Sequence, residues 1–251
     1  MKDYLGFFDA YTLKARFIPA ILATLPLLAL IGCYFNLNQA FVSNVVVGGL
    51  VAFSSIFLLS NFARLFGLKV ERKLVLKWGV LPTTQFLRHN DLNLSAQKKH
   101  QIHLKITAKS SIVLPSASQE SNDPLNSDLV YDEAVAWIRE NTRGSDFSVL
   151  LADNINYGFI RNCLGLKYIA ISICVLVLII FSVLFFSFYP ASSFNQIEVL
   201  KFLKSQKMAI WLTLGLTIVM LVLWITMVTE NNVTKAAHKY AKTLLNSTYK
   251  L

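Results

Sequence analysis

A run of 22 uncharged residues, Tyr168–Tyr189, limits most strongly what this chain can fold into. Fifteen of these residues are Leu, Ile, Val or Phe. A helix of this length rises about 33 Å at roughly 1.5 Å per residue, which matches the hydrocarbon core of a bilayer. At roughly −0.3 to −0.6 kcal/mol each, the fifteen side chains favour insertion by about 4 to 9 kcal/mol, so the run is predicted to be a transmembrane helix.

Three further segments without a formal charge are predicted to span the membrane: Phe17–Phe35, Ala40–Ala63 and Met208–Thr229. A buried helix of a soluble protein is the alternative for any one of them, but such helices seldom contain more than about 18 uncharged residues. The turn NLNQ joins the first two spans, and residues 190–207 join the last two. The chain therefore contains two predicted transmembrane hairpins, at residues 17–63 and 168–229.

The distribution of Lys and Arg predicts the orientation. Residues 1–16 contain three, residues 64–167 fourteen and residues 230–251 four, whereas residues 190–207 contain three and the NLNQ turn none. The count is 21 against 3, so both termini and the central region are predicted to be cytoplasmic. The central region balances its fourteen basic residues with ten Asp and Glu, which is too mildly basic to indicate a nucleic-acid partner.

The central region, residues 64–167, is predicted to be a mostly helical cytoplasmic domain of about 100 residues. The helix of the second span, 40–63, is predicted to continue to about Trp78, and the segment from Asp146 to run straight into the third span, Tyr168–Tyr189. A segment starting near Ser95 fits either a helix or a strand, because Ile102, Leu104 and Ile106 alternate. Residues 110–127 are rich in Ser, Asn, Asp and Pro and are predicted to be a loop, followed by a helix capped by Asp128.

The fold class is thus an all-α membrane protein, with four transmembrane helices in two hairpins flanking a cytoplasmic domain. The tail, residues 230–251, is predicted to be an amphipathic helix with Lys235, Lys239 and Lys242 beside its apolar stripe. Such a helix either packs on the cytoplasmic domain or lies on anionic lipid, and the sequence leaves both open.

Dispersed cations and aromatic rings in the central region suggest a site for an anion or a nucleotide. Guanidinium groups bind phosphate in a bidentate manner, and aromatic rings stack on bases. The residues that form this candidate site are Arg72, Lys73, Arg88, Arg139, Arg143, Arg161, Trp78 and Trp137. No phosphate-binding or catalytic motif supports it, and arginines near tryptophans are also common in domains next to a membrane.

A polar segment before span three suggests a second candidate site, which we call the collar. Basic and aromatic residues are ordinary anchors at a membrane interface, but an interface does not require several Asp and Asn side chains. We hypothesise that the collar transmits rearrangements of the domain to the spans. Its residues are Asp153, Asn154, Asn156, Tyr157, Arg161 and Asn162.

No metal site, cofactor or enzymatic activity is predicted. His100 and His103 lie three residues apart, but lysines surround them and a solvated basic face is expected. The three cysteines form no CxxC pattern. An enzyme would have only the collar, these histidines and the carboxylates Asp132 and Glu133 as hints.

None of the four predicted spans contains Asp, Glu, Lys, Arg or His, which disfavours a pump or a secondary transporter. A pore lined by hydroxyl groups stays open, with Ser172, Ser182, Thr213, Thr217 and Thr226 as the available residues. Because four helices leave little room for a channel, conduction would require a homo-oligomer.

Two short transmembrane hairpins flanking one cytoplasmic domain resemble the layout of small bacterial membrane effectors of anti-phage signalling systems. The similarity concerns the architecture of the whole chain and includes no aligned motif. It implies a multi-pass protein of the bacterial inner membrane, oligomerisation, and a nucleotide or protein trigger at the cytoplasmic domain. The alternative is a non-conducting membrane scaffold or sensor that recruits a cytoplasmic partner.

Overall fold

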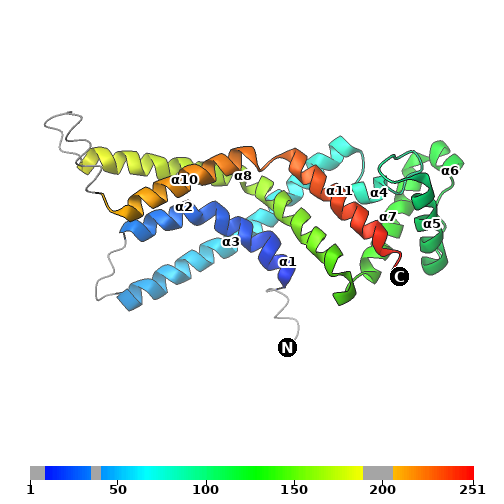
Figure 1. The fold of residues 1–251 in the computed structure, drawn as a ribbon, viewed down its shortest axis with the longest axis horizontal. Helices are drawn as coiled ribbons and strands as arrows, with labels where there is room; N and C mark the ends of the chain where they lie inside the picture. Colours follow the sequence, from blue (N-terminus) through cyan, green and yellow to red (C-terminus); the bar gives the residue numbers. More distant parts are fainter. Residues whose placement is uncertain (1–8, 35–40, 189–205) are drawn as a thin grey trace. The chain divides into compact units, whose positions relative to one another are not determined.

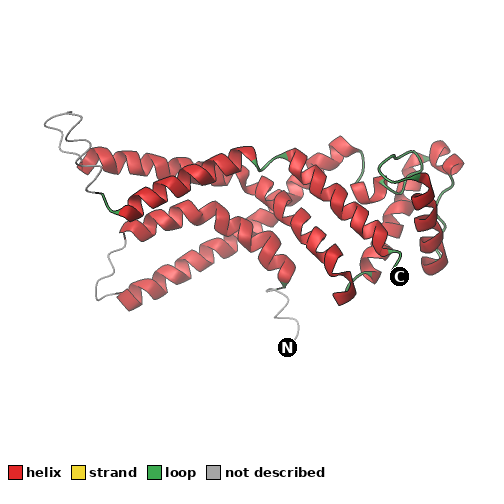
Figure 2. Cartoon of the chain, in the orientation of Figure 1, coloured by secondary structure: helices red, strands yellow, loops and turns green. Residues whose placement is uncertain are grey.

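The computed structural model describes residues 9–34, 41–188 and 206–251, and all regular elements in these ranges are helices (Figures 1 and 2). Within them, four helical stretches are long and apolar enough to cross a membrane: Ala10–Cys33, Gly48–Gln85, Ser145–Ser187 and Met208–Thr226. The predicted all-helical class with four apolar spans is therefore confirmed. The NLNQ turn and nearly all of the connection predicted at 190–207 lie outside the described residues.

The chain divides into two compact units. The first, which we call the apolar unit, comprises Met1–Leu68 and Asn162–Thr229, and the second, the polar unit, comprises Lys69–Arg161 and Glu230–Leu251. Two long helices, α3 (Phe41–Trp78) and α8 (Ser148–Phe188), contribute residues to both units. The sequence predicted both continuations correctly, because the helical spacing of apolar residues persists beyond the uncharged runs.

The apolar unit contains α1 (Ala10–Thr12), a π-helical turn η2 (Leu13–Phe17), α2 (Ile18–Tyr34) and α10 (Met208–Thr226), together with parts of α3 and α8. Its buried residues are mostly small or hydroxylated, among them Ala15, Ala20, Ala23, Ser60, Ala63, Ala170 and Thr217. Large apolar side chains such as Leu50, Val183 and Leu212 are exposed. This distribution is typical of helices that pack through small residues and face lipid with large ones.

Helices α3 and α8 approach each other closely at two glycines of the apolar unit. A Cβ atom on Gly165 would lie 2.6 Å from the backbone nitrogen of Gly67 and 2.7 Å from the carbonyl carbon of Phe66. A Cβ atom on Gly67 would lie 2.0 Å from Oδ1 of Asn162. The two backbones can therefore meet only because both positions lack a side chain.

The polar unit packs its helices around an ordinary hydrophobic core. Its further elements are α4 (Pro82–Gln85), α5 (Ala96–Ser110), α6 (Ala117–Asn122), α7 (Pro124–Asn141), a 3₁₀ turn η3 (Ser145–Phe147) and α11 (Glu230–Ser247). The core includes Phe86, Leu87, Ile102, Ile106, Tyr131, Val135, Ile138, Leu244 and Leu245. Since the last two belong to α11, the tail helix packs on this unit, which was one of the two predicted alternatives.

Two local predictions about the central region need correction. The loop predicted at residues 110–127 contains α6, because Ser116 and Gln119 form a reciprocal capping box. The following helix begins at Pro124 and is capped by Asp123, so the prediction that Asp128 caps it was wrong. The segment after Ser95 is the helix α5, since the Ser95 side chain accepts a hydrogen bond from the Lys98 N–H.

Two buried charges fix the loops of the polar unit. The Glu120 carboxylate accepts hydrogen bonds from the backbone N–H groups of His89 and Asn90 and from the Tyr131 hydroxyl, 2.7 Å away. The Lys99 ammonium donates to the carbonyl oxygens of Arg88, His89 and Asp91 at 2.5–2.9 Å, and the side chain is only 4% exposed. Both charges are paired with several dipoles, which offsets the cost of burying them.

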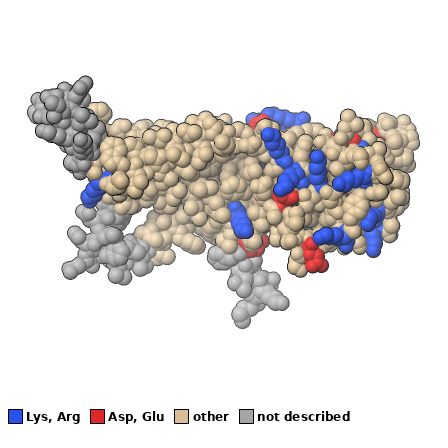
Figure 3. Space-filling view, in the orientation of Figure 1, with Lys and Arg blue, Asp and Glu red and all other residues tan. Residues whose placement is uncertain are grey.

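The two units also differ in surface charge. In the face shown in Figure 3, Lys, Arg, Asp and Glu gather over the polar unit, while the described surface of the apolar unit is almost free of them. The charged side chains on this face are therefore concentrated in the polar unit.

Candidate functional site

A carboxylate with two partners lies at the centre of the candidate site. Glu71 of α3 accepts a hydrogen bond from the Tyr157 hydroxyl at 2.6 Å and forms an ion pair with Nη1 of Arg161 at 2.5 Å. Both partners belong to α8. The Arg161 guanidinium lies 5.4 Å from the centre of the Tyr157 ring, and that ring stacks on Tyr240 of α11 at 6.1 Å. We call Glu71, Tyr157 and Arg161 the Glu71 cluster.

The Glu71 cluster forms part of the wall of a cavity of about 240 Å³ within the polar unit, which we call the first cavity. Its remaining lining residues are Leu81, Pro82, Thr83, Arg139, Asn154, Ala237 and Tyr240. Since Arg161 neutralises Glu71, the charge of Arg139 is left uncompensated in this lining.

A second cavity of about 340 Å³ shares Arg139, Asn154 and Tyr240 with the first. Its other lining residues are Thr142, Arg143, Gly144, Phe147, Leu150, Leu151 and Leu244. The lining of the second cavity thus combines two guanidinium groups and an amide with aromatic rings and leucines. A cavity of this size with few polar groups fits a small ligand.

The structure brings together only part of the predicted anion site. Arg139, Arg143 and Arg161 line these two cavities, whereas Arg72, Lys73, Arg88, Trp78 and Trp137 line neither. Arg88 pairs with Asp128, 2.7 Å from Nε to Oδ1, and Lys73 pairs with Glu230 at 3.4 Å. Trp137 packs against the hydrophobic core.

The residues of the predicted collar have separate roles. Asp153 is buried, accepts a hydrogen bond from Thr243 at 2.7 Å and pairs with Lys239 at 2.8 Å, so it holds α11 against α8. Asn154 lines both cavities, and Tyr157 and Arg161 belong to the Glu71 cluster. The side chain of Asn156 is exposed.

Asn162, the last collar residue, belongs to the apolar unit. Its amide nitrogen donates a hydrogen bond to the carbonyl oxygen of Ala15 at 2.7 Å. Four residues after Ala15 comes Pro19, which has no N–H with which to complete a helical hydrogen bond to that carbonyl. Asn162 therefore satisfies a backbone group that proline leaves open, as neighbouring helices do inside membranes.

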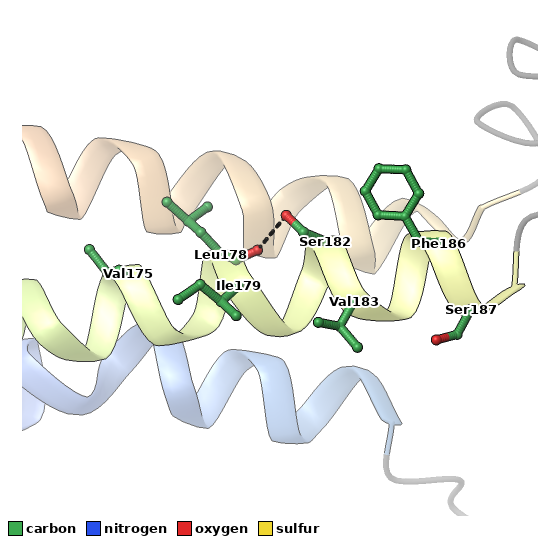
Figure 4. Close-up of a pocket in the computed structure, with 7 residues that line it drawn as sticks. All are labelled: Val175, Leu178, Ile179, Ser182, Val183, Phe186 and Ser187. Atoms are coloured by element: carbon green, nitrogen blue, oxygen red, sulfur yellow. Dashed lines mark hydrogen bonds between the residues drawn. The ribbon is translucent and has the colours of Figure 1, made fainter.

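Four of the five hydroxyl groups predicted as pore-lining candidates, those of Ser182, Thr213, Thr217 and Thr226, bond within their own helices, and the Thr213 hydroxyl also contacts the Cys33 thiol at 3.0 Å. Thr217 donates to the carbonyl of Thr213 at 2.7 Å, and Thr226 donates to that of Val222 at 2.8 Å. On α8, Ser182 donates to the carbonyl of Leu178 at 3.0 Å (Figure 4). These two residues, with Val175, Ile179, Val183, Phe186 and Ser187, line an open apolar groove on α8.

His100 and His103 differ in their surroundings, although both lie on α5. His100 is exposed, but His103 is half-buried, so a solvated face was the wrong expectation for it. Nε2 of His103 donates to the carbonyl oxygen of Leu87 at 2.8 Å, and burial lowers the pKa of His103 to about 4. In the described part of the chain, no group of three His, Cys, Asp or Glu side chains is arranged to hold a metal ion.

Glu71 and Tyr240 are the site residues that sequence analysis missed. Glu71 stands alone among Lys69, Arg72 and Lys73, and a single carboxylate in a basic helix is usually paired locally. Its partner Arg161 is 90 positions away. One feature of the sequence could have indicated the pair. A charge next to an apolar helix favours an opposite charge as its partner, and Glu71 and Arg161 lie near the ends of the apolar runs of α3 and α8.

Comparison with known proteins finds no family model, no curated protein and no solved structure that the chain matches. Its function must therefore be inferred from the cavities, the Glu71 cluster and the composition of the two units.

Proposed function

We propose that this chain is a multi-pass membrane effector that conducts ions as a homo-oligomer and is gated by its polar unit. The observation that carries the proposal is the Glu71 cluster, because it joins α3 and α8. These are the same two helices that continue into the apolar unit. A ligand or partner that breaks or strengthens the cluster acts directly on two candidate spans.

The charge distribution supports a cytoplasmic polar unit and cytoplasmic termini, with two transmembrane hairpins in a bacterial inner membrane. Twenty-one of the 24 Lys and Arg residues fall outside the predicted outer connections. An opposite orientation would require the polar unit, with most of these cations, to cross the membrane.

Oligomerisation is part of the proposal because one chain offers few lining groups. The hydroxyls of Ser182, Thr217 and Thr226 are each bonded within their own helix. A conducting path between several chains would place exposed surfaces of α8 or α10 around a shared axis. The resemblance to effectors of anti-phage systems supplies a biological setting, which survival of phage-infected cells expressing the chain would test.

Membrane potential in bacteria tests the effector function. The intact chain is induced and followed with a potential-sensitive dye, beside Arg161→Ala and the control Arg72→Ala, all matched for abundance in the membrane. Arg72 lies one residue from Glu71 on α3 but is exposed and outside the Glu71 cluster. We expect depolarisation by the wild type and by Arg72→Ala, and at least a fivefold smaller effect with Arg161→Ala.

Equal depolarisation by the two variants would contradict a gating role for the cluster. Absence of depolarisation by well-inserted wild type, even during phage infection, would contradict the effector function. The alternative would then be a scaffold or sensor, which predicts a cytoplasmic protein that stays bound through purification in mild detergent.

A further inference from the structure

The two cavities of the polar unit contain more positive charge than the protein itself neutralises. Arg139 lies in the last turn of α7 and Arg143 two residues beyond its end, and both side chains are exposed. Neither forms an ion pair with any residue that the structure describes. They are also the two charged residues in the lining of the second cavity.

A position near the end of a helix is by itself an ordinary place for arginine, because the carbonyl end of the helix dipole attracts cations. That dipole amounts to about half a charge, whereas the lining carries two guanidinium groups, and like charges in one lining repel each other. The lining of the second cavity thus keeps a net positive charge. An anion placed between the two groups would relieve the repulsion with charge-assisted hydrogen bonds.

The rest of the second cavity fits an apolar body attached to that anion. Phe147, Leu150, Leu151 and Leu244 contribute apolar surface, and Tyr240 contributes a ring that is already held against Tyr157. Asn154, shared with the first cavity, offers an amide for one polar substituent. The volume of about 340 Å³ exceeds what an inorganic ion alone requires and falls in the range of small-ligand sites.

We propose that the second cavity binds a small organic phosphate, with the phosphate group held by Arg139 and Arg143 and an apolar or aromatic body against Phe147 and Tyr240. The inference deepens the proposed function, since it names the chemical class of the trigger. It rests on that function only for the step from binding to conduction. Tyr240 connects the ligand to the Glu71 cluster through its stacking on Tyr157.

Binding is measured by calorimetry on the purified full chain in phosphatidylcholine nanodiscs, with phenyl phosphate as the probe. Inorganic phosphate lacks the ring and phenol lacks the charge, so both serve as comparison ligands. We expect saturable binding of phenyl phosphate, at least fivefold weaker binding of inorganic phosphate and no measurable binding of phenol.

Two charge-matched variants test the residues. Arg139→Gln with Arg143→Gln should weaken binding of phenyl phosphate at least tenfold. Lys109→Gln with Lys235→Gln removes the same charge from exposed positions outside both cavities and should leave affinity within twofold. All four side chains are exposed, so both variants should keep the wild-type circular dichroism spectrum and unfolding midpoint.

Competition by a water-soluble, short-chain phosphatidylglycerol identifies the source of the phosphate. Displacement of phenyl phosphate would assign the site to a lipid headgroup, and failure to displace it would assign the site to a soluble metabolite. Lack of saturable binding of phenyl phosphate by the wild type would overturn the proposal, as would equal losses in the two double variants. Binding that persists in a chain that never depolarises cells would refute the effector function and leave the site intact.

Discussion

The two units of this chain are built on opposite rules of burial. The polar unit buries large side chains such as Phe86, Ile138 and Leu245 and exposes most of its charges, together with single leucines such as Leu92. The apolar unit buries alanines and hydroxyl groups and exposes Leu212 and Val183, which are 65% and 57% exposed. A core of large apolar side chains is typical of a unit that folds in water, whereas small buried residues beneath large exposed ones are typical of helices that pack in lipid.

The difference also extends to polar contacts. In the polar unit, ion pairs and buried carboxylates connect helices to loops, as Glu120 does. In the apolar unit, side chains donate hydrogen bonds to backbone carbonyls. Asn162 donates to the carbonyl of Ala15, and Lys167 donates to those of Ile225 and Val228 at 3.1 and 2.8 Å. Stability should therefore depend on large side chains in one unit and on close backbone approach in the other.

Truncating one leucine in each unit tests this comparison with the largest expected effect. Leu245→Ala removes a fully buried side chain from the core of the polar unit and should lower the free energy of unfolding by about 2–5 kcal/mol. Leu212→Ala removes an exposed side chain of α10 and should change it by less than about 0.5 kcal/mol. Denaturant unfolding in detergent micelles measures both, and similar losses would show that the apolar unit is not packed as described.

Enlarging a small residue tests the opposite dependence. Gly165→Ala places a Cβ atom against the α3 backbone and should cost about 1–3 kcal/mol, because backbone must move. Gly215→Ala, where no atom lies within 4 Å, is the matched control and should be neutral or slightly stabilising. Thermal unfolding in micelles gives the comparison, and a Gly165→Ala midpoint equal to that of the control would refute the close crossing.

Removing the amide of Asn162 should have a smaller effect. Asn162→Ala leaves the Ala15 carbonyl without its hydrogen bond, and interhelical hydrogen bonds in membranes contribute about 0.6–1.7 kcal/mol. Asn156→Ala removes an exposed amide from the same helix and should be silent. If both variants unfold at the same denaturant concentration as the wild type, the carbonyl has another partner.

A pH dependence of the polar unit is expected as well. Burial lowers the pKa of His103 to about 4, with His89 and Lys99 also disfavouring its charge, while the Leu87 carbonyl and Glu120 oppose this shift. The unfolded chain takes up this proton near pH 6.5, so stability is complete above that pH and is lost as pH falls towards about 4. His103→Gln should flatten this slope of unfolding midpoint against pH, and His100→Gln should keep it.

Sequence patterns predicted long elements well and pairings poorly. The extents of α3 and α8 followed from apolar spacing that persists over tens of residues. The loop at residues 110–127 was overestimated because Ser116, Asp123 and Pro124 suit a turn and a helix start equally well. Which of the two they form depends on Glu120, whose partners His89 and Tyr131 lie elsewhere in the chain.

The sequence predicted the types of residue in the candidate site, but not which individual residues form it. Arg139 and Arg143 were identified because guanidinium groups near aromatic rings fit anions, and both line the second cavity. Arg88 has the same chemistry but is occupied by Asp128, a partner 40 residues away that no local pattern reveals. Long-range pairing thus decides which arginines remain available.

Because the Lys99 ammonium is buried, covalent labelling of this lysine measures local opening of the polar unit. With three carbonyl acceptors and 4% exposure, this lysine should be among the slowest in the chain to react with an amine-specific reagent, while exposed lysines such as Lys109 and Lys235 react at once. Mass spectrometry of the acylated peptide would then report how often the polar unit opens around Lys99, without any substitution and in native membranes.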